Sequence, residues 1–186
     1  MAQAGDVIDN PVQLHSVKFI ETSAQSNGAS LKLEYTIQAG GKALPWHIHL
    51  KQAEHFKVVS GQLGIRLDTF ENITILNPGE EIHIEARRPH QFYNASETEP
   101  VTTLFDVTPA GDFETFLQTY YGLARDGKIR DSQVPVDLLQ AAVLADIADT
   151  YPVWGTFSAY IIAFVLKIVG TFARLLGYKV LPDQYK

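Results

Sequence analysis

The 186-residue chain contains no cysteine, which excludes disulfides, thiolate nucleophiles and thiolate metal ligands. It also lacks a basic excess, because its formal net charge at pH 7 is −6. We therefore expect no nucleic-acid partner, since binding to phosphate backbones requires clustered lysine and arginine. The first residues show neither the basic start nor the apolar core of a signal peptide. Together with the missing disulfides, this predicts a cytoplasmic protein.

Long hydrophobic runs are scarce, and the composition is that of an ordinary globular protein, with 46% hydrophobic and 19% charged residues. A chain of this length predicts one domain with an appendage. The sequence contains no glycine-rich phosphate loop, no nucleophile elbow and no long internal repeat. Among the side chains that carry chemistry, histidine is the one whose spacing stands out.

Three of the six histidines and one glutamate stand at informative positions within two short segments, residues 41–61 and 79–94. His47 and His49 are one residue apart, so on a strand their side chains would project to the same side. Glu54 begins the next apolar run, and a tight turn would direct its carboxylate back toward this pair. With His90 they make three imidazoles and one carboxylate, which suit a first-row divalent metal. Whether Glu54 binds the metal or acts as a free general base stays open.

The two segments resemble the two motifs of the cupin superfamily, over about residues 12–108. The first motif is matched throughout, at Gly41, His47, His49, Glu54 and Gly61. The second is matched at Gly79, His90 and Asn94, but Glu85-Ala86-Arg87 stands where the family has Pro-x-Gly. The resemblance implies one divalent transition metal, iron, manganese, nickel, copper or zinc, held by His47, His49, Glu54 and His90.

The same resemblance implies a mainly β fold: a single jelly-roll barrel, built as a double-stranded β-helix, followed by about three C-terminal α-helices. The residues agree, because short β-type runs alternate with turns between about residues 14 and 108. We assign residues 1–110 to the barrel with its N-terminal arm. Residues 111–186 are expected to form a helical extension that packs on the barrel or on a partner subunit.

Helical periodicity predicts helices at residues 112–125, 135–149 and about 156–176. The third is apolar nearly all round, which is typical of a buried helix. We expect it to be buried against the barrel or a second subunit, and we expect a homodimer. Two alternatives are less favoured: a membrane span, and a peripheral membrane contact helped by Lys167, Arg174 and Lys179.

Alternation along the strands predicts an apolar pocket around the metal. Its expected lining is Tyr35, Phe56, Val58, Phe92 and Asn94. Taken alone, each of these residues is more often part of the barrel core than a substrate contact. The pocket would hold a small-molecule ligand or substrate.

The other charged and titratable residues near the motifs are expected at the surface. This applies to the remaining histidines, His15, His55 and His83. It also applies to Arg87 and Arg88, unless their turn borders the pocket mouth and meets an anionic substrate.

The function that the sequence favours is a metal-binding protein that acts on a small molecule, with a metal-dependent dioxygenase-type oxidoreductase as the leading hypothesis. Glu54 would then also be the candidate catalytic residue, as a carboxylate that moves a proton. One alternative is a metal-containing binding or sensing module without turnover. Another is an isomerase or epimerase of a sugar-like substrate, which would require more polar pocket residues than the sequence offers. Whether the protein is an enzyme at all stays open at this point.

Overall fold

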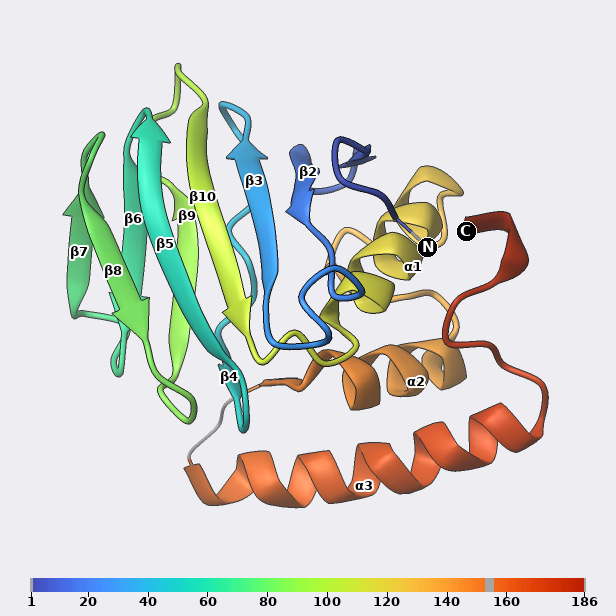
Figure 1. Cartoon of the computed structure of the whole chain (residues 1–186). Helices are drawn as coiled ribbons and strands as arrows, with labels where there is room; N and C mark the ends of the chain where they lie inside the picture. Colours follow the sequence, from blue (N-terminus) through green and yellow to red (C-terminus); the bar gives the residue numbers. More distant parts are fainter. Residues whose placement is uncertain (1, 153–155, 186) are drawn as a thin grey trace.

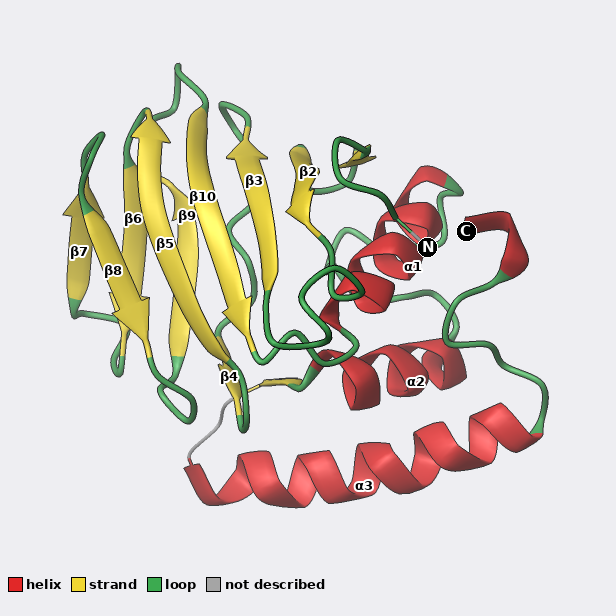
Figure 2. Ribbon diagram, viewed as in Figure 1, coloured by secondary structure: helices red, strands yellow, loops and turns green. Residues whose placement is uncertain are grey.

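The computed structural model describes residues 2–152 and 156–185 of the chain. Its strands form two antiparallel sheets, with the helices to one side and beneath them (Figures 1 and 2). The first sheet has the order β1 (Val7–Asn10), β2 (His15–Glu21), β3 (Leu31–Ile37), β10 (Val101–Thr108), β5 (Ala53–Ser60), β8 (Glu81–Ile84). The second has the order β11 (Thr150–Pro152), β4 (His47–His49), β9 (His90–Asn94), β6 (Leu63–Leu67), β7 (Ile73–Leu76). Neighbours in space are often distant in the chain, which confirms the predicted jelly roll.

The core lies between the two sheets and follows the alternation of the strands. Leu31, Leu33, Tyr35 and Ile37 of β3 are buried, whereas the residues between them are not. Three phenylalanines from three strands then fill the centre: Phe56 stacks on Phe105 at 4.6 Å and meets Phe92 at 4.8 Å between ring centroids. Aromatic rings of this size bury large apolar areas and dominate the packing energy of such a core.

The three predicted helices are present as α1 (Phe113–Arg125), α2 (Leu138–Ala148) and α3 (Thr156–Leu175). The predicted start of the second helix at Pro135 was wrong by three residues. Asp137 caps this helix instead, because its side chain accepts from the backbone N–H groups of Leu139 and Gln140 at 2.9 and 3.3 Å.

Helix α3 is covered on one side only. It lies along the lower edge of the molecule beneath α2 (Figure 1). The approach is close at Gly170, where a Cβ atom would lie 3.0 Å from the carbonyl oxygen of Ala142. Its opposite side exposes a row of large apolar residues, so α2 alone does not bury this helix. Residues Ser158–Leu175 are long and apolar enough to cross a membrane, which by itself is weak support for a span.

The extension is not helical throughout, because residues 150–152 return to the barrel as strand β11. This strand pairs with β4, with Thr150 opposite His49 and Pro152 opposite His47. This strand could not be predicted, since three residues are too few for a strand pattern. The extension is therefore joined by backbone hydrogen bonds to the strand that carries two of the candidate metal ligands.

The turn that departs from the second motif keeps the backbone shape of a glycine turn. Arg87 stands at the glycine position and has a φ of 70°, in the left-handed region. Its N–H donates to the carbonyl oxygen of His49 at 2.6 Å, and its Nε donates weakly to the carbonyl oxygen of Leu50 at 3.4 Å. The turn thus supports the β4 segment although the residue there carries a Cβ atom.

A pair of substitutions at Arg87 should measure the strain of a non-glycine residue in the left-handed region. An L-residue in the left-handed region is disfavoured by about 1 kcal/mol or more relative to glycine. We expect Arg87→Gly to be more stable than Arg87→Ala by about that amount, as measured by chemical denaturation. Both variants lose the arginine side chain, so their difference isolates the backbone effect. Equal stabilities would contradict a strained turn.

Candidate metal centre

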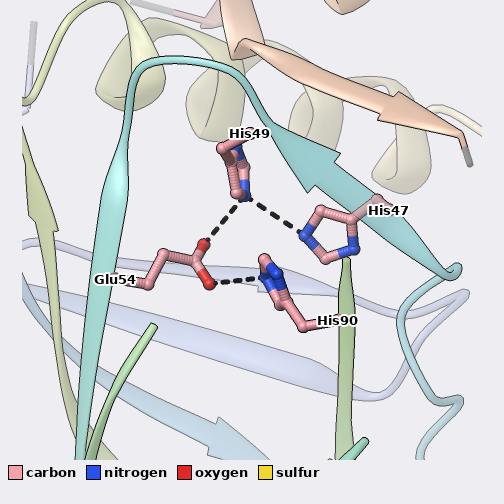
Figure 3. Close-up of side chains that lie close together, drawn as sticks. All are labelled: His47, His49, Glu54 and His90. Atoms are coloured by element: carbon pink, nitrogen blue, oxygen red, sulfur yellow. Dashed lines mark hydrogen bonds and ion pairs between the residues drawn. The ribbon is translucent and has the colours of Figure 1, made fainter. Parts of the chain in front are cut away.

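Four buried side chains converge inside the barrel (Figure 3). His47 and His49 come from β4, Glu54 from β5 and His90 from β9, and all four are between 1% and 3% exposed. Strand register brings them together, because His47 lies opposite His90 in the β4–β9 pair. One ligand atom from each lies within 4.8 Å of the others. The predicted quartet is therefore assembled at one point.

Backbone carbonyl groups fix which nitrogen of each imidazole faces the centre. The Nδ1 atoms of His47, His49 and His90 lie 2.7, 3.1 and 2.9 Å from the carbonyl oxygens of Pro45, Asp149 and Arg88. A carbonyl oxygen can only accept, so each Nδ1 carries the hydrogen. In the neutral imidazoles, each Nε2 therefore presents a lone pair to the interior, which is the arrangement that metal-binding histidines use.

The inner atoms lie close together without a full set of hydrogen bonds. Nε2 of His47 lies 3.2 Å from Nε2 of His49, which in turn lies 3.1 Å from Oε1 of Glu54. His90 Nε2 and Glu54 Oε2 are 2.9 Å apart, but they lack hydrogen-bond geometry and both remain without a hydrogen-bond partner. Buried lone pairs that face one another are unfavourable, and a bound cation would relieve them. Three imidazoles and a carboxylate thus fit a divalent transition metal.

The electrostatics keep the carboxylate ionised. Burial raises the pKa of the Glu54 carboxyl, but the neighbouring imidazoles of His49 and His90 outweigh burial and hold this pKa well below its usual range. For His47, burial and the neighbouring His90 and His49 lower the pKa well below the ordinary value. For His90, burial lowers the pKa, but the Glu54 carboxylate outweighs burial and leaves it raised. Glu54 is thus ionised and His47 neutral, which are the forms that bind metals.

Asp149, from the helical extension, positions the turn between β4 and β5. Its side chain accepts hydrogen bonds from the N–H groups of Lys51 and Gln52 at 2.7 and 3.2 Å. Its carbonyl oxygen accepts from Nδ1 of His49. Asp149 itself adopts a left-handed conformation with a φ of 51°, which aspartate and asparagine tolerate better than most residues. One residue of the extension therefore orients His49 and the turn that leads to Glu54.

A cavity of about 510 Å³ opens beside the cluster. His47, His49 and Glu54 lie in its lining, and the rest is mostly apolar. The barrel contributes Tyr35, Leu44, Trp46, Phe92 and Phe105; the helices contribute Phe113, Phe116, Leu117, Tyr120, Tyr121, Leu138, Ala142, Leu144, Leu166 and Val169. All three helices thus form part of the cavity. Sequence reasoning missed this, because apolar positions at helical spacing look the same whether they face a core or a cavity.

The five predicted pocket residues divide into two groups. Tyr35 and Phe92 lie in the cavity lining. The other three lie elsewhere among the described residues: Phe56 stacks on Phe105, and Val58 is buried in the core. Asn94 donates through Nδ2 to the carbonyl oxygens of Ile37, Gln38 and Glu99, and so holds the loop after β9.

The prediction that His15 lies at the surface was wrong. It is 2% exposed, because it shares the inward face of β2 with Val17 and Phe19. Its Nδ1 lies 2.8 Å from the hydroxyl of Tyr35 and its Nε2 lies 2.9 Å from the carbonyl oxygen of Lys42. Burial lowers the pKa of His15 to about 4, so the ring is neutral near pH 7.

The other predicted surface residues do lie away from the cavity. His55 and His83 stack on each other at 4.2 Å between centroids; His83 is exposed and His55 half-buried. Arg88 forms an ion pair with Asp68, through Nε at 3.0 Å. Neither Arg87 nor Arg88 lies in the described lining of the cavity, so neither is placed to meet a substrate.

Residues 33–107 match the family model described as a cupin domain. The jelly roll and the ligand quartet agree with this match, so residues 33–107 form a cupin domain.

Relatives of this chain are named as oxidoreductases. An oxidoreductase of Arthrobotrys oligospora is 26% identical over 153 residues, which cover 77% of this chain and 59% of that protein. The probable oxidoreductase patJ of Aspergillus clavatus is 29% identical over 153 residues, covering 77% of this chain and 46% of that protein. The chain thus spans about half the length of these relatives. Among solved structures, a cupin-like protein of Thermotoga maritima has a TM-score of 0.45 at 17% identity, covering 52% of this chain and 68% of that one.

Substitution of Asp149 should test the contribution of the extension to the centre. Asp149→Ala removes the acceptor for two N–H groups, and we expect metal affinity to fall about tenfold or more. Asp149→Asn keeps an acceptor oxygen and tolerates the left-handed backbone, so its affinity should stay near that of the wild type. Metal titration of both variants measures the difference. Equal affinities in the two would show that the side chain of Asp149 does not position the ligands.

Proposed function

We propose that this protein is a metal-dependent oxidoreductase of the dioxygenase type, acting on an apolar, ring-containing small molecule. One observation carries the proposal: three Nε2 lone pairs and a carboxylate converge at the edge of an apolar cavity of about 510 Å³. The relatives named as oxidoreductases support the redox class. The apolar lining argues against a sugar isomerase, which would have to hydrogen-bond several hydroxyl groups.

Each part of the site has a defined task under this proposal. A first-row divalent metal held by the four side chains would keep about two of six coordination positions for exogenous ligands and would supply one-electron or Lewis-acid chemistry. The mostly apolar lining would limit the access of water and would hold a substrate ring beside the quartet. Glu54 would help to hold the metal, and its carboxylate could also accept a proton from a substrate hydroxyl.

Metal content and oxygen uptake together test this function. We expect about one equivalent of iron, nickel or copper in protein purified anaerobically without added metal, measured by elemental mass spectrometry. His49→Ala should remain folded but lose most of the metal, because it removes one ligand and leaves the core strands intact. His83→Ala, which removes an exposed histidine, should keep the metal. Unchanged metal content in His49→Ala would overturn the ligand assignment.

The reaction class is tested with an oxygen electrode and a panel of aromatic and enolic substrates. Oxygen consumption by the wild-type protein and by His83→Ala, but not by His49→Ala, is the expected result. A ligand that raises the melting temperature without being consumed would favour a binding or sensing module instead. Zinc or manganese without oxygen uptake would point to non-redox chemistry, as in the isomerase alternative.

We also propose that the protein is a homodimer through helix α3. Eight large apolar side chains of α3 and the turn after it are about half exposed or more: Tyr160, Ile161, Phe164, Val165, Ile168, Phe172, Leu175 and Leu176. Large exposed apolar patches of this kind mark interaction surfaces. Ile161, Val165, Ile168, Phe172 and Leu175 follow the alternating spacing of four and three that packs one helix against another. This row carries no charge, so it is complementary to a second copy of itself.

A single charge in the centre of this row should separate the subunits. We expect Ile168→Glu to be a folded monomer, because two buried carboxylates would meet at the helix–helix contact. Lys167→Glu changes the charge more, but on an exposed residue outside the row, and should remain a dimer. Light scattering of the two variants and the wild type measures the mass. A monomeric wild type that floats with anionic vesicles would show that the row contacts a membrane instead.

A further inference from the structure

One end of the cavity carries a hydrogen-bonded chain of three buried side chains. Tyr35 of β3 and Tyr121 of α1 both lie in the cavity lining, and His15 of β2 lies behind Tyr35. The hydroxyl of Tyr121 donates to the hydroxyl oxygen of Tyr35 at 3.1 Å, and the hydroxyl of Tyr35 lies 2.8 Å from Nδ1 of His15. The residues of the metal centre take no part in these hydrogen bonds.

The contact between His15 and Lys42 determines which group donates in each of these hydrogen bonds. Nε2 of His15 faces the carbonyl oxygen of Lys42 at 2.9 Å, and because that oxygen can only accept, Nε2 carries the hydrogen. Burial keeps the imidazole neutral, so Nδ1 has a lone pair and no hydrogen. The Tyr35 hydroxyl must therefore donate to His15, and its oxygen is left to accept the single hydrogen of Tyr121.

The hydroxyl groups of Tyr35 and Tyr121 thus each donate their only hydrogen to another group of the protein. Burial raises the pKa of Tyr35 and of Tyr121, so both stay protonated and the direction holds near pH 7. The third tyrosine of the lining behaves in the same way, since Tyr120 donates its hydroxyl hydrogen to the carbonyl oxygen of Gln133 at 2.8 Å. What Tyr35 and Tyr121 have left for a ligand is lone pairs.

We propose that this end of the cavity selects ligands that donate a hydrogen bond, namely the hydroxyl of an aromatic or alicyclic alcohol. This proposal rests on the proposed function in one respect: it assumes that a small, ring-containing molecule occupies the cavity. An ether or carbonyl oxygen placed against these two hydroxyl groups would meet other acceptors, whereas a hydroxyl would find an acceptor for its hydrogen. His15 acts as a positioning residue, because it sets the direction of the chain without touching the ligand.

Two probes with the same ring test the selection: 2-naphthol, which can donate, and 2-methoxynaphthalene, which can only accept. Binding is measured by calorimetry on the full chain after metal removal, so no turnover is involved. We expect the wild type to bind 2-naphthol roughly tenfold more tightly than the ether, the size of effect that one matched hydrogen bond gives in a dry site. No preference, or no binding of either probe, would overturn the proposal.

Two matched variants distinguish the effect of the donor and acceptor assignment from the effect of losing a hydroxyl group. Tyr35→Phe frees the hydrogen of Tyr121 to point into the cavity, so the tenfold preference should vanish or invert. Tyr121→Phe leaves the Tyr35 hydrogen committed to His15, so the preference should persist. Each variant removes one hydroxyl and adds the same space, and a steric cause would affect both alike. Equal effects in the two variants would contradict the assigned direction.

Tyr35→Phe leaves the buried Nδ1 of His15 without a donor, so its folding is checked by denaturation. Should it fail to fold, His15→Phe takes its place, because it frees the Tyr35 hydrogen and should abolish the preference in the same way. None of these residues is a proposed metal ligand, so metal content should match the wild type in all three variants. Lost oxygen uptake with a retained preference would count against the proposed function alone, and the reverse result against this proposal alone.

Discussion

The structure depends on one constraint: three backbone carbonyl groups face the outer nitrogens of three histidines. Because each carbonyl can only accept, each imidazole turns its lone pair inward, and the ionised Glu54 adds a fourth acceptor at the same point. Four converging acceptors in a folded interior are unfavourable, and a cation that joins them would relieve the cost. The barrel around the centre supplies the stability that holds this unfavourable arrangement in place.

The carbonyl groups come from three different parts of the molecule. That of Pro45 precedes β4, that of Arg88 lies in the turn before β9, and that of Asp149 follows α2. The turn at Arg87 and the strand β11 are therefore part of the framework of the metal centre. They place the acceptors that decide which face each imidazole presents.

Much of the fold and the quartet could be predicted from sequence because both depend on short-range patterns. The alternation in β3 and the spacing of His47, His49 and Glu54 are local, and a strand turns local spacing into a shared face. The long-range features could not be predicted. His15 belongs to no motif, and only its pairing with β3 shows that it points inward. Likewise, the sequence pattern of α1 does not distinguish a Tyr121 that lines a cavity from one that is packed in the core.

The contact between Asp149 and His49 has a consequence for the way the chain is made. Every ligand of the centre has been synthesised once His90 has left the ribosome, but the residue that orients His49 follows 100 positions after it. At ordinary rates of synthesis, that leaves an interval on the order of seconds in which the barrel strands exist without the extension. During this interval the quartet has its side chains but not its full orientation. The quartet therefore reaches its final geometry only after Asp149 has left the ribosome, and not in the emerging barrel.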